Sequence, residues 1–108
     1  MTEAGSHLDS LGRFAEPGLL ILISLAGGPK HGYAMTTDIE RLSEVRLGPG
    51  TLYGAIARLE QRGLIEALDA DDRRRPYRLT AEGGRVLRAR LDTLQRMART
   101  GARRLARS

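Results

Sequence analysis

The sequence is 108 residues long, with 18 Lys and Arg against 13 Asp and Glu, an ordinary apolar fraction of 41% and no cysteine. This length fits one domain with an appended helix, and the missing cysteines exclude disulfides and thiolate metal sites. The longest apolar run, Leu19–Ala26, is much shorter than a membrane span, and no secretory signal is recognisable at the N-terminus, so we expect a soluble protein of the cytoplasm.

The first half of the chain predicts an arm followed by helices. Residues 1–16 are expected to form an N-terminal arm or a short helix, because apolar residues recur there at helical spacing. Pro17 suits the first turn of a helix that includes the apolar run and ends at residues 27–29, although a buried strand is the alternative for this run. A second, amphipathic helix is predicted over Gly32–Leu42. We expect His31, just before it, to form a cap or another local hydrogen bond rather than to contact a phosphate.

A third helix is predicted over Pro49–Arg62, with Gly63 as its C-terminal cap. Before this helix, Ser43–Leu47 is a candidate for a small strand. The buried face of the third helix is marked by apolar residues at helical spacing, namely Leu52, Ile56 and Leu59.

Two short strands are predicted next, over Leu64–Leu68 and Tyr77–Thr80, joined by a charged hairpin. Thr80 is a natural N-cap for a long final helix. The order of three helices, two strands and one helix predicts a fold that is mainly α with a small β-hairpin. We expect a winged helix-turn-helix DNA-binding domain over residues 17–80 and a C-terminal dimerisation helix over residues 81–108.

The third helix is the candidate for DNA recognition, because apolar residues anchor one of its faces and leave small and polar residues on the other. At its start, Gly50, Thr51 and Tyr53 are expected to point toward bases and phosphates, with Arg58 farther along. Tyr33, at the start of the second helix, either donates its hydroxyl to a phosphate or packs with the hydroxyl in water. The alternative for the third helix is an ordinary amphipathic helix with Tyr53 half buried.

The hairpin between the two strands is the candidate wing. Arg73, Arg74 and Arg75 suit a minor groove or the flanking phosphates, where the negative potential is strong. Alternatively, the aspartates within residues 69–72 neutralise these arginines in a solvated turn. Arg78 is expected to lie along the sheet.

The final helix carries the excess positive charge. Residues 1–80 contain 10 basic and 11 acidic residues, whereas residues 81–108 contain 8 arginines and 2 acids. These arginines could form a nucleic-acid stripe, but a heptad pattern of apolar residues favours a dimerisation helix with solvated flanks. The seam of that helix consists of Leu87, Leu91, Leu94, Ala98, Gly101 and Leu105.

Nothing in the sequence predicts catalysis. There are two histidines, no carboxylate cluster at ligand spacing and no phosphate-binding loop, so we expect no metal, no cofactor and no enzyme.

Four blocks within residues 18–90 resemble the PadR-like transcriptional regulators in order and spacing: Gly28–Met35, Leu47–Tyr53, Arg58–Ile65 and Tyr77–Gly83. The resemblance implies a winged-helix homodimer that binds a palindromic operator in double-stranded DNA and represses genes. It also implies that the C-terminal helix packs on the N-terminal region of the partner. The DNA contacts that it implies are Tyr33, Gly50, Thr51, Tyr53, Arg58 and the wing arginines.

Two features depart from the family pattern. Pro76 stands where many members have an aromatic or basic residue, so the second wing strand should be short or edge-like. The chain has no tryptophan, whereas some short members stack planar drugs between tryptophans in a dimer pore. A pore here would be lined by aliphatic residues, with Phe14 from the arm, so we expect no such drug sensing and leave any small-molecule effector unidentified. The alternative function is a winged-helix module for protein interaction or dimerisation without specific DNA binding.

Overall fold

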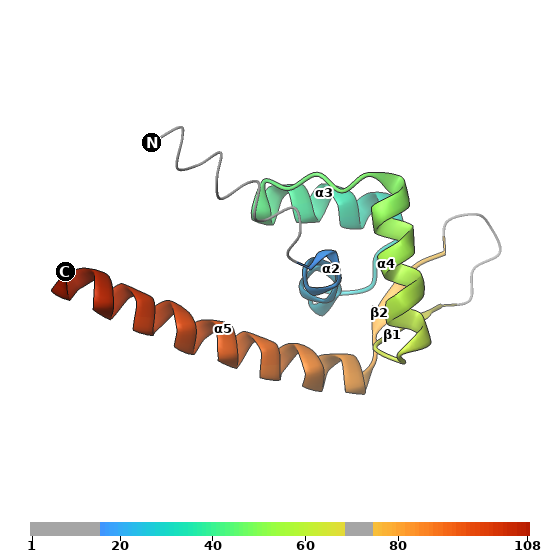
Figure 1. Cartoon of the computed structure of the whole chain (residues 1–108). Helices are drawn as coiled ribbons and strands as arrows, with labels where there is room; N and C mark the ends of the chain where they lie inside the picture. Colours follow the sequence, from blue (N-terminus) through green and yellow to red (C-terminus); the bar gives the residue numbers. More distant parts are fainter. Residues whose placement is uncertain (1–15, 69–74) are drawn as a thin grey trace.

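The computed structural model describes residues 16–68 and 75–108 (Figure 1). Their elements follow in the order α2 (Pro17–Ala26), α3 (Gly32–Ser43), α4 (Pro49–Gln61), β1 (Ile65–Ala67), β2 (Tyr77–Leu79) and α5 (Ala81–Arg107). The predicted fold class is confirmed: helices predominate, one antiparallel hairpin follows α4, and a long helix ends the chain.

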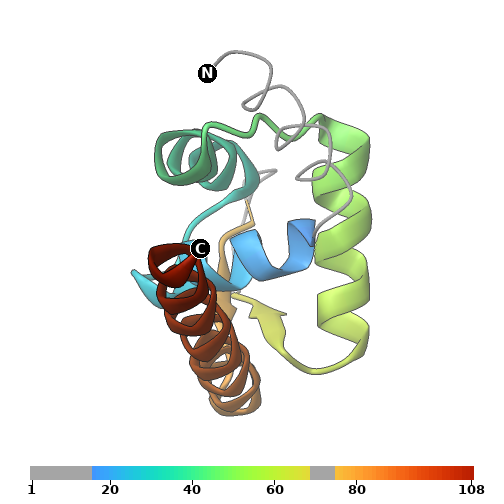
Figure 2. The same cartoon turned by 60° about the vertical axis from the view of Figure 1, so that its left-hand side comes forward.

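Helix α2 lies at the centre of the molecule. Figures 1 and 2 place it between α3 and α5 in one view and between α4 and α5 in the other, and it also contacts β2. Because α2 is covered on several sides, its sequence is apolar nearly all round rather than on one stripe. Ile21, Leu22 and Leu25 are buried there against Met35 of α3 and Ile56 of α4. The helical interpretation of the apolar run is therefore confirmed.

The strand predicted over Ser43–Leu47 is wrong. Ser43 ends α3, where its hydroxyl donates to the Ile39 carbonyl at 2.7 Å and accepts from the Val45 amide at 3.1 Å. Glu44 then adopts a left-handed conformation, with φ of 60°, which breaks any extended run. The backbone that pairs with the outer side of β2 is that of Lys30, which forms an isolated bridge with Tyr77.

Helix α4 matches its prediction closely. It ends at Gln61, and Gly63 has a φ of 74°, the left-handed conformation that glycine adopts most easily after a helix. Its predicted apolar face is buried, with exposures of 2% to 7% for Leu52, Ile56 and Leu59.

The hairpin joins α4 to α5 through a tight junction. Its register pairs Glu66 with Arg78, and each strand has three residues, fewer than predicted. Thr80 lies outside the strand and caps α5 as predicted: its hydroxyl accepts from the Gly83 amide at 3.0 Å and donates to the Gly63 carbonyl at 2.7 Å. Gly83 is required here, because a Cβ at this position would lie 2.0 Å from the Leu64 carbonyl oxygen.

Helix α5 has two different halves. In the first half, Leu87 is buried in the chain's own core and Leu91 packs against that core. The second half extends beyond the domain, and its apolar side chains are exposed, reaching 63% for Met97 and 77% for Leu105 (Figure 1). Leu94, Ala98 and Leu105 of the predicted dimer seam therefore have no place in the core that the described residues form. Within the described ranges, no helix combines the length and apolar character that crossing a membrane requires.

Candidate nucleic-acid interface

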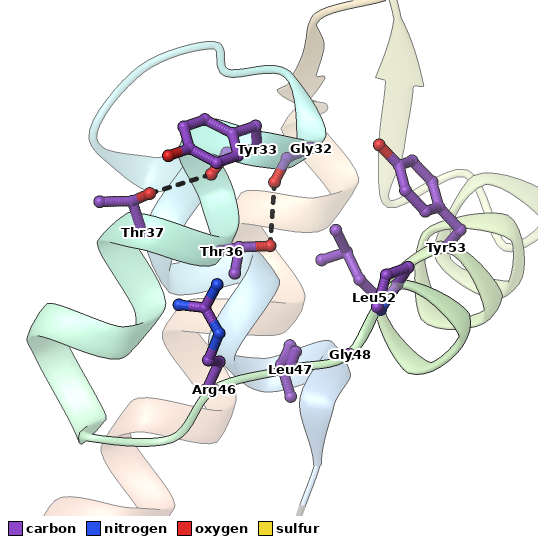
Figure 3. A pocket seen from close by; sticks show the side chains of 10 residues that line it. Gly32, Tyr33, Thr36, Thr37, Arg46, Leu47, Gly48, Leu52 and Tyr53 are labelled. Carbon is purple, nitrogen blue, oxygen red and sulfur yellow. Dashed lines mark hydrogen bonds between the residues drawn. The ribbon is translucent and has the colours of Figure 1, made fainter.

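A groove of about 450 Å³ lies between α3 and the start of α4 (Figure 3). It is lined by side chains from both helices and from the turn that joins them, so it opens on the face where a helix-turn-helix domain meets DNA. The lining residues that sequence reasoning had selected are Tyr33 and Tyr53; the structure adds Thr36, Thr37 and Arg46.

Tyr33 projects into solvent at the edge of this groove. Its side chain is 75% exposed, so the ring does not pack into the core. The other interpretation from the sequence, a contact between its hydroxyl and a phosphate, stays a prediction. The neighbouring Thr36 and Thr37 hydroxyls donate to the carbonyls of Gly32 and Tyr33, both at 3.2 Å (Figure 3). These hydroxyls keep free lone pairs that can accept hydrogen bonds from a ligand.

Tyr53 connects the two helices across the groove. It is 52% exposed, and its ring lies directly over Gly32 at the first turn of α3. A Cβ at residue 32 would lie 2.3 Å from the Tyr53 hydroxyl, so this ring position needs a glycine. The phenol hydroxyl is consequently held beside the N-terminal turn of α3, where backbone amides lack helical partners.

The first turn of α4 is open to solvent. Gly50 and Thr51 are exposed, the turn contains no acidic residue, and Gly48 offers no side-chain cap. The amide groups of this turn can therefore meet an anion. A Cβ at Gly50 would meet nothing within 4 Å, so packing inside the chain does not require a glycine there.

Arg58 lies in a different place. It lines a second groove, about 390 Å³, between the start of α2, the end of α4 and the first half of α5, together with Arg62 and Arg90. Arg90 and Glu16 form an ion pair at 2.5 Å beside it. The structure thus brings Tyr33, Tyr53 and the start of α4 together but separates Arg58 from them.

Arg46 is a groove residue that sequence reasoning missed. Its side chain is 70% exposed, and its guanidinium pairs with the Glu40 carboxylate at 2.8 Å. An exposed pair of this kind is weak and can exchange for a phosphate. The signal in the sequence that could have identified Arg46 is its position as a basic residue in the short turn just before the third helix.

The wing is described at its base. Arg73 and Arg74 fall outside the described residues, as do the aspartates that could neutralise them, so both wing interpretations stay open. Arg75 is exposed at the start of the described return strand. Arg78 lies along the sheet as predicted, pairing with Glu66 at 2.6 Å.

Tyr77, which follows in β2, is buried, and this burial raises the pKa of its phenol. The Glu60 carboxylate raises this pKa further, whereas Arg75 opposes the shift. The phenol is therefore neutral at physiological pH and adds no charge to the base of the wing.

His31 caps α3, as the sequence predicted: its Nδ1 accepts from the Ala34 amide at 3.4 Å. Across the residues with described positions, no group of histidines and carboxylates is arranged to hold a metal ion.

Comparisons with known proteins agree with this architecture. A profile described as "Transcriptional regulator PadR-like family" matches residues 21–89. A curated relative, an uncharacterized 37.1 kDa protein in transposon TN4556 of Streptomyces fradiae, is 45% identical over 80 residues, or 74% of this chain. The chain spans only 23% of the length of that relative.

Solved structures extend the likeness. A PadR family transcription regulator from Clostridium difficile has a TM-score of 0.75 at 26% identity, over 84% of this chain and 99% of that one. A transcriptional regulator from Clostridium thermocellum has a TM-score of 0.71 at 27% identity, over 79% and 88%. RosR of H. salinarum has a TM-score of 0.66 at 29% identity, over 73% of both chains. The chain therefore belongs to the PadR-like family of transcriptional regulators.

Proposed function

We propose that the protein is a homodimeric repressor that binds a palindromic operator in cytoplasmic DNA. The observation that carries this proposal is the exposed first turn of α4, which adjoins the groove containing Tyr33, Tyr53 and Arg46. A helix that is anchored by a buried apolar face and open at its N-terminus suits insertion into a major groove.

In this proposal, residues 17–80 form the DNA-binding unit. Gly50 and Thr51 approach base edges, while Tyr33 and Tyr53 contact phosphates on either side of the groove. Arg58 lies outside this groove and would contact DNA only beyond the groove's edge. The wing arginines Arg73, Arg74 and Arg75 contact the flanking minor groove or its phosphates.

Residues 81–108 form the dimerisation helix. Since Leu87 and Leu91 serve the chain's own core, we assign the contact with the partner mainly to the second half, with Leu94, Ala98 and Leu105. A dimer would place two α4 helices about one DNA turn apart, roughly 34 Å, on the two halves of a palindrome. Occupation of such an operator at a promoter excludes RNA polymerase, which gives repression.

The test is a gel shift of the purified protein on the promoter of its own gene, with the solution mass measured by sedimentation. We expect Tyr53→Ala to weaken binding to the preferred duplex by about tenfold, since a charge-assisted contact contributes about 1.5 kcal/mol. Gln61→Ala, at the exposed far end of the same helix, is the matched control. Unchanged affinity for Tyr53→Ala would exclude the placement of α4 in the major groove.

The second candidate, a module for protein interaction alone, is supported by the same exposed half of α5. Binding to one duplex that survives moderate salt would exclude it, because nonspecific electrostatic binding falls steeply with salt.

A further inference from the structure

Lys30 stands where three parts of the domain meet: the end of α2, helix α3 and the wing. Its backbone amide donates to the Tyr77 carbonyl at 3.1 Å, and its carbonyl accepts from the Tyr77 amide at 2.9 Å. These two hydrogen bonds add a third backbone partner to the two-stranded wing. They attach the wing directly to the loop between α2 and α3, whereas the β1–β2 pairing lies within the wing itself.

The side chain of Lys30 continues this attachment toward the helices. Its ammonium donates to the Ser24 carbonyl at 2.6 Å and to the Gly28 carbonyl at 3.3 Å. It lies 4.0 Å from the Asp38 carboxylate on α3, and the same carboxylate oxygen accepts from the Ser24 hydroxyl at 2.7 Å. Ser24 is only 1% exposed, and the Lys30 and Asp38 side chains are 22% and 26% exposed.

The charged groups of Lys30 and Asp38 are largely removed from water, so the hydrogen bonds that each of them forms with its neighbours are stronger than those of a surface pair. The remaining exposure of Lys30 is small, and its ammonium is directed at α2 and α3. A direct contact with DNA phosphates therefore does not explain the residue.

The loop that carries Lys30 is restricted at Pro29 but has little stiffness before it. It contains Gly27 and Gly28, and Gly28 has a φ of 135°, a conformation that glycine adopts readily and other residues rarely do. Because the two glycines leave the loop many accessible conformations, the side-chain contacts of Lys30 support the two backbone hydrogen bonds that hold it opposite Tyr77. Losing them would release the bridge while leaving the helices packed.

We propose that Lys30, supported by Asp38, is a positioning residue that fixes the wing against α2 and α3 and so sets how Arg75 meets DNA. Arg75 lies two residues before Tyr77, so the bridge controls the direction in which the wing leaves the domain. The part of this inference that concerns DNA rests on the proposed function. The attachment of the wing is a property of the protein without DNA.

The first experiment measures amide hydrogen exchange in the DNA-free protein. The Tyr77 amide reports the bridge directly, and the Ile56 amide in α4 reports global stability. We expect Lys30→Met, which keeps the aliphatic stem, to accelerate exchange at Tyr77 by roughly tenfold while Ile56 changes little.

Two further variants control this experiment. Arg85→Met removes an equal charge from the exposed pair of Arg85 with Glu82 and should leave Tyr77 unchanged. Lys30→Arg, which keeps the charge and donors, should restore most of the protection. Equal exchange at Tyr77 in Lys30→Met and the unchanged protein, or equal acceleration at Tyr77 and Ile56, would overturn the proposal.

The second experiment measures how DNA binding changes when the negative charge of Asp38 is removed. Asp38→Ala removes a negative charge from a protein that binds a polyanion, so through-space electrostatics alone predicts tighter DNA binding. Loss of wing positioning predicts the opposite, about threefold weaker binding to the preferred duplex, with reduced hydroxyl-radical protection on the flanking nucleotides only.

Tighter binding of Asp38→Ala, or a uniform loss of protection along the duplex, would overturn the assignment to the wing. If the unchanged protein prefers no duplex at all, the proposed function fails. The exchange experiment still decides whether Lys30 positions the wing.

Discussion

The two halves of α5 use their apolar residues in different ways. In the first half, Leu87 is 5% exposed and belongs to the same core as Ile21 and Ile56, whereas in the second half Met97 and Leu105 are mostly exposed. Since helices in proteins gain most of their stability from packing one face, the second half lacks, among the described residues, the packing that the first half has. The first half of α5 thus belongs to the core of the winged-helix domain, whereas the apolar residues Met97 and Leu105 of the second half are exposed in the described part of the chain.

Charge divides the molecule in a related way. The segment that forms the winged-helix domain is nearly neutral, and the arginine excess lies on residues 81–108. In the proposed function, DNA binding by the groove between α3 and α4 therefore depends on local geometry. The basic helix supplies a general attraction to polyanions.

The largest expected effect is a loss of stability on substitution in the buried first half of α5. Leu87→Ala should lower the free energy of unfolding by about 3 kcal/mol, because it opens a cavity in the core. Its matched control, Leu105→Ala, should change the unfolding of dilute protein by less than about 0.5 kcal/mol but weaken self-association. Chemical denaturation followed by circular dichroism, with sedimentation at several concentrations, measures both. Similar losses for the two variants in dilute protein would show that the halves of α5 are not distinct.

An intermediate effect is expected at the junction where α5 begins. Gly83→Ala should destabilise the fold by about 2 kcal/mol, because its Cβ would collide with a backbone carbonyl that cannot swing aside. Gly84→Ala, one residue along the same helix, places its Cβ 4.0 Å from Leu79 and should instead stabilise by about 0.5 to 1 kcal/mol. Thermal unfolding of the two variants gives the sign of each change, and a stable Gly83→Ala protein would contradict the tight junction.

The smallest expected effect is a change in DNA affinity, and it is tested with one arginine beside the groove and one on the second half of α5. Arg46→Gln should weaken binding to the preferred duplex by about threefold and reduce the salt slope by about 0.9, the effect of one lost phosphate contact. Arg103→Gln, on the exposed second half of α5, should leave the slope unchanged. Fluorescence anisotropy at a series of salt concentrations separates these outcomes. An equal change in both slopes would restore the idea of a basic stripe along α5.

Most element boundaries could be predicted because their signals are local. Pro17 and Pro49 begin helices, Gly63 ends one, and Thr80 caps another, and each signal acts through the backbone of its own turn. The strand predicted over Ser43–Leu47 failed because α3 continues to Ser43 and Glu44 turns left-handed, and the backbone that pairs with β2 is that of Lys30, far from it in sequence.

The candidate site was predicted only in part. The tyrosines and the start of α4 could be found from helix periodicity, but the separation of Arg58 depends on where α2 and α5 lie beside the end of α4. The network of Ser24, Lys30 and Asp38 joins residues up to fourteen positions apart on two helices and a loop, and no periodic pattern marks it. A heptad seam likewise does not say which of its residues face the chain's own core.

The hydroxyl of Thr80 contacts both the end of α4 and the start of α5, and this contact has a consequence for operator geometry. A helix of 27 residues is about 40 Å long, so a 10° change at its base would displace its far end by roughly 7 Å. In the proposed dimer, an elastic junction would let each subunit accept half-sites at many separations. In that dimer, the junction that Thr80 forms with Gly63 and Gly83 would instead fix the spacing between half-sites, so that inserting or deleting a base pair at the operator centre should not be tolerated.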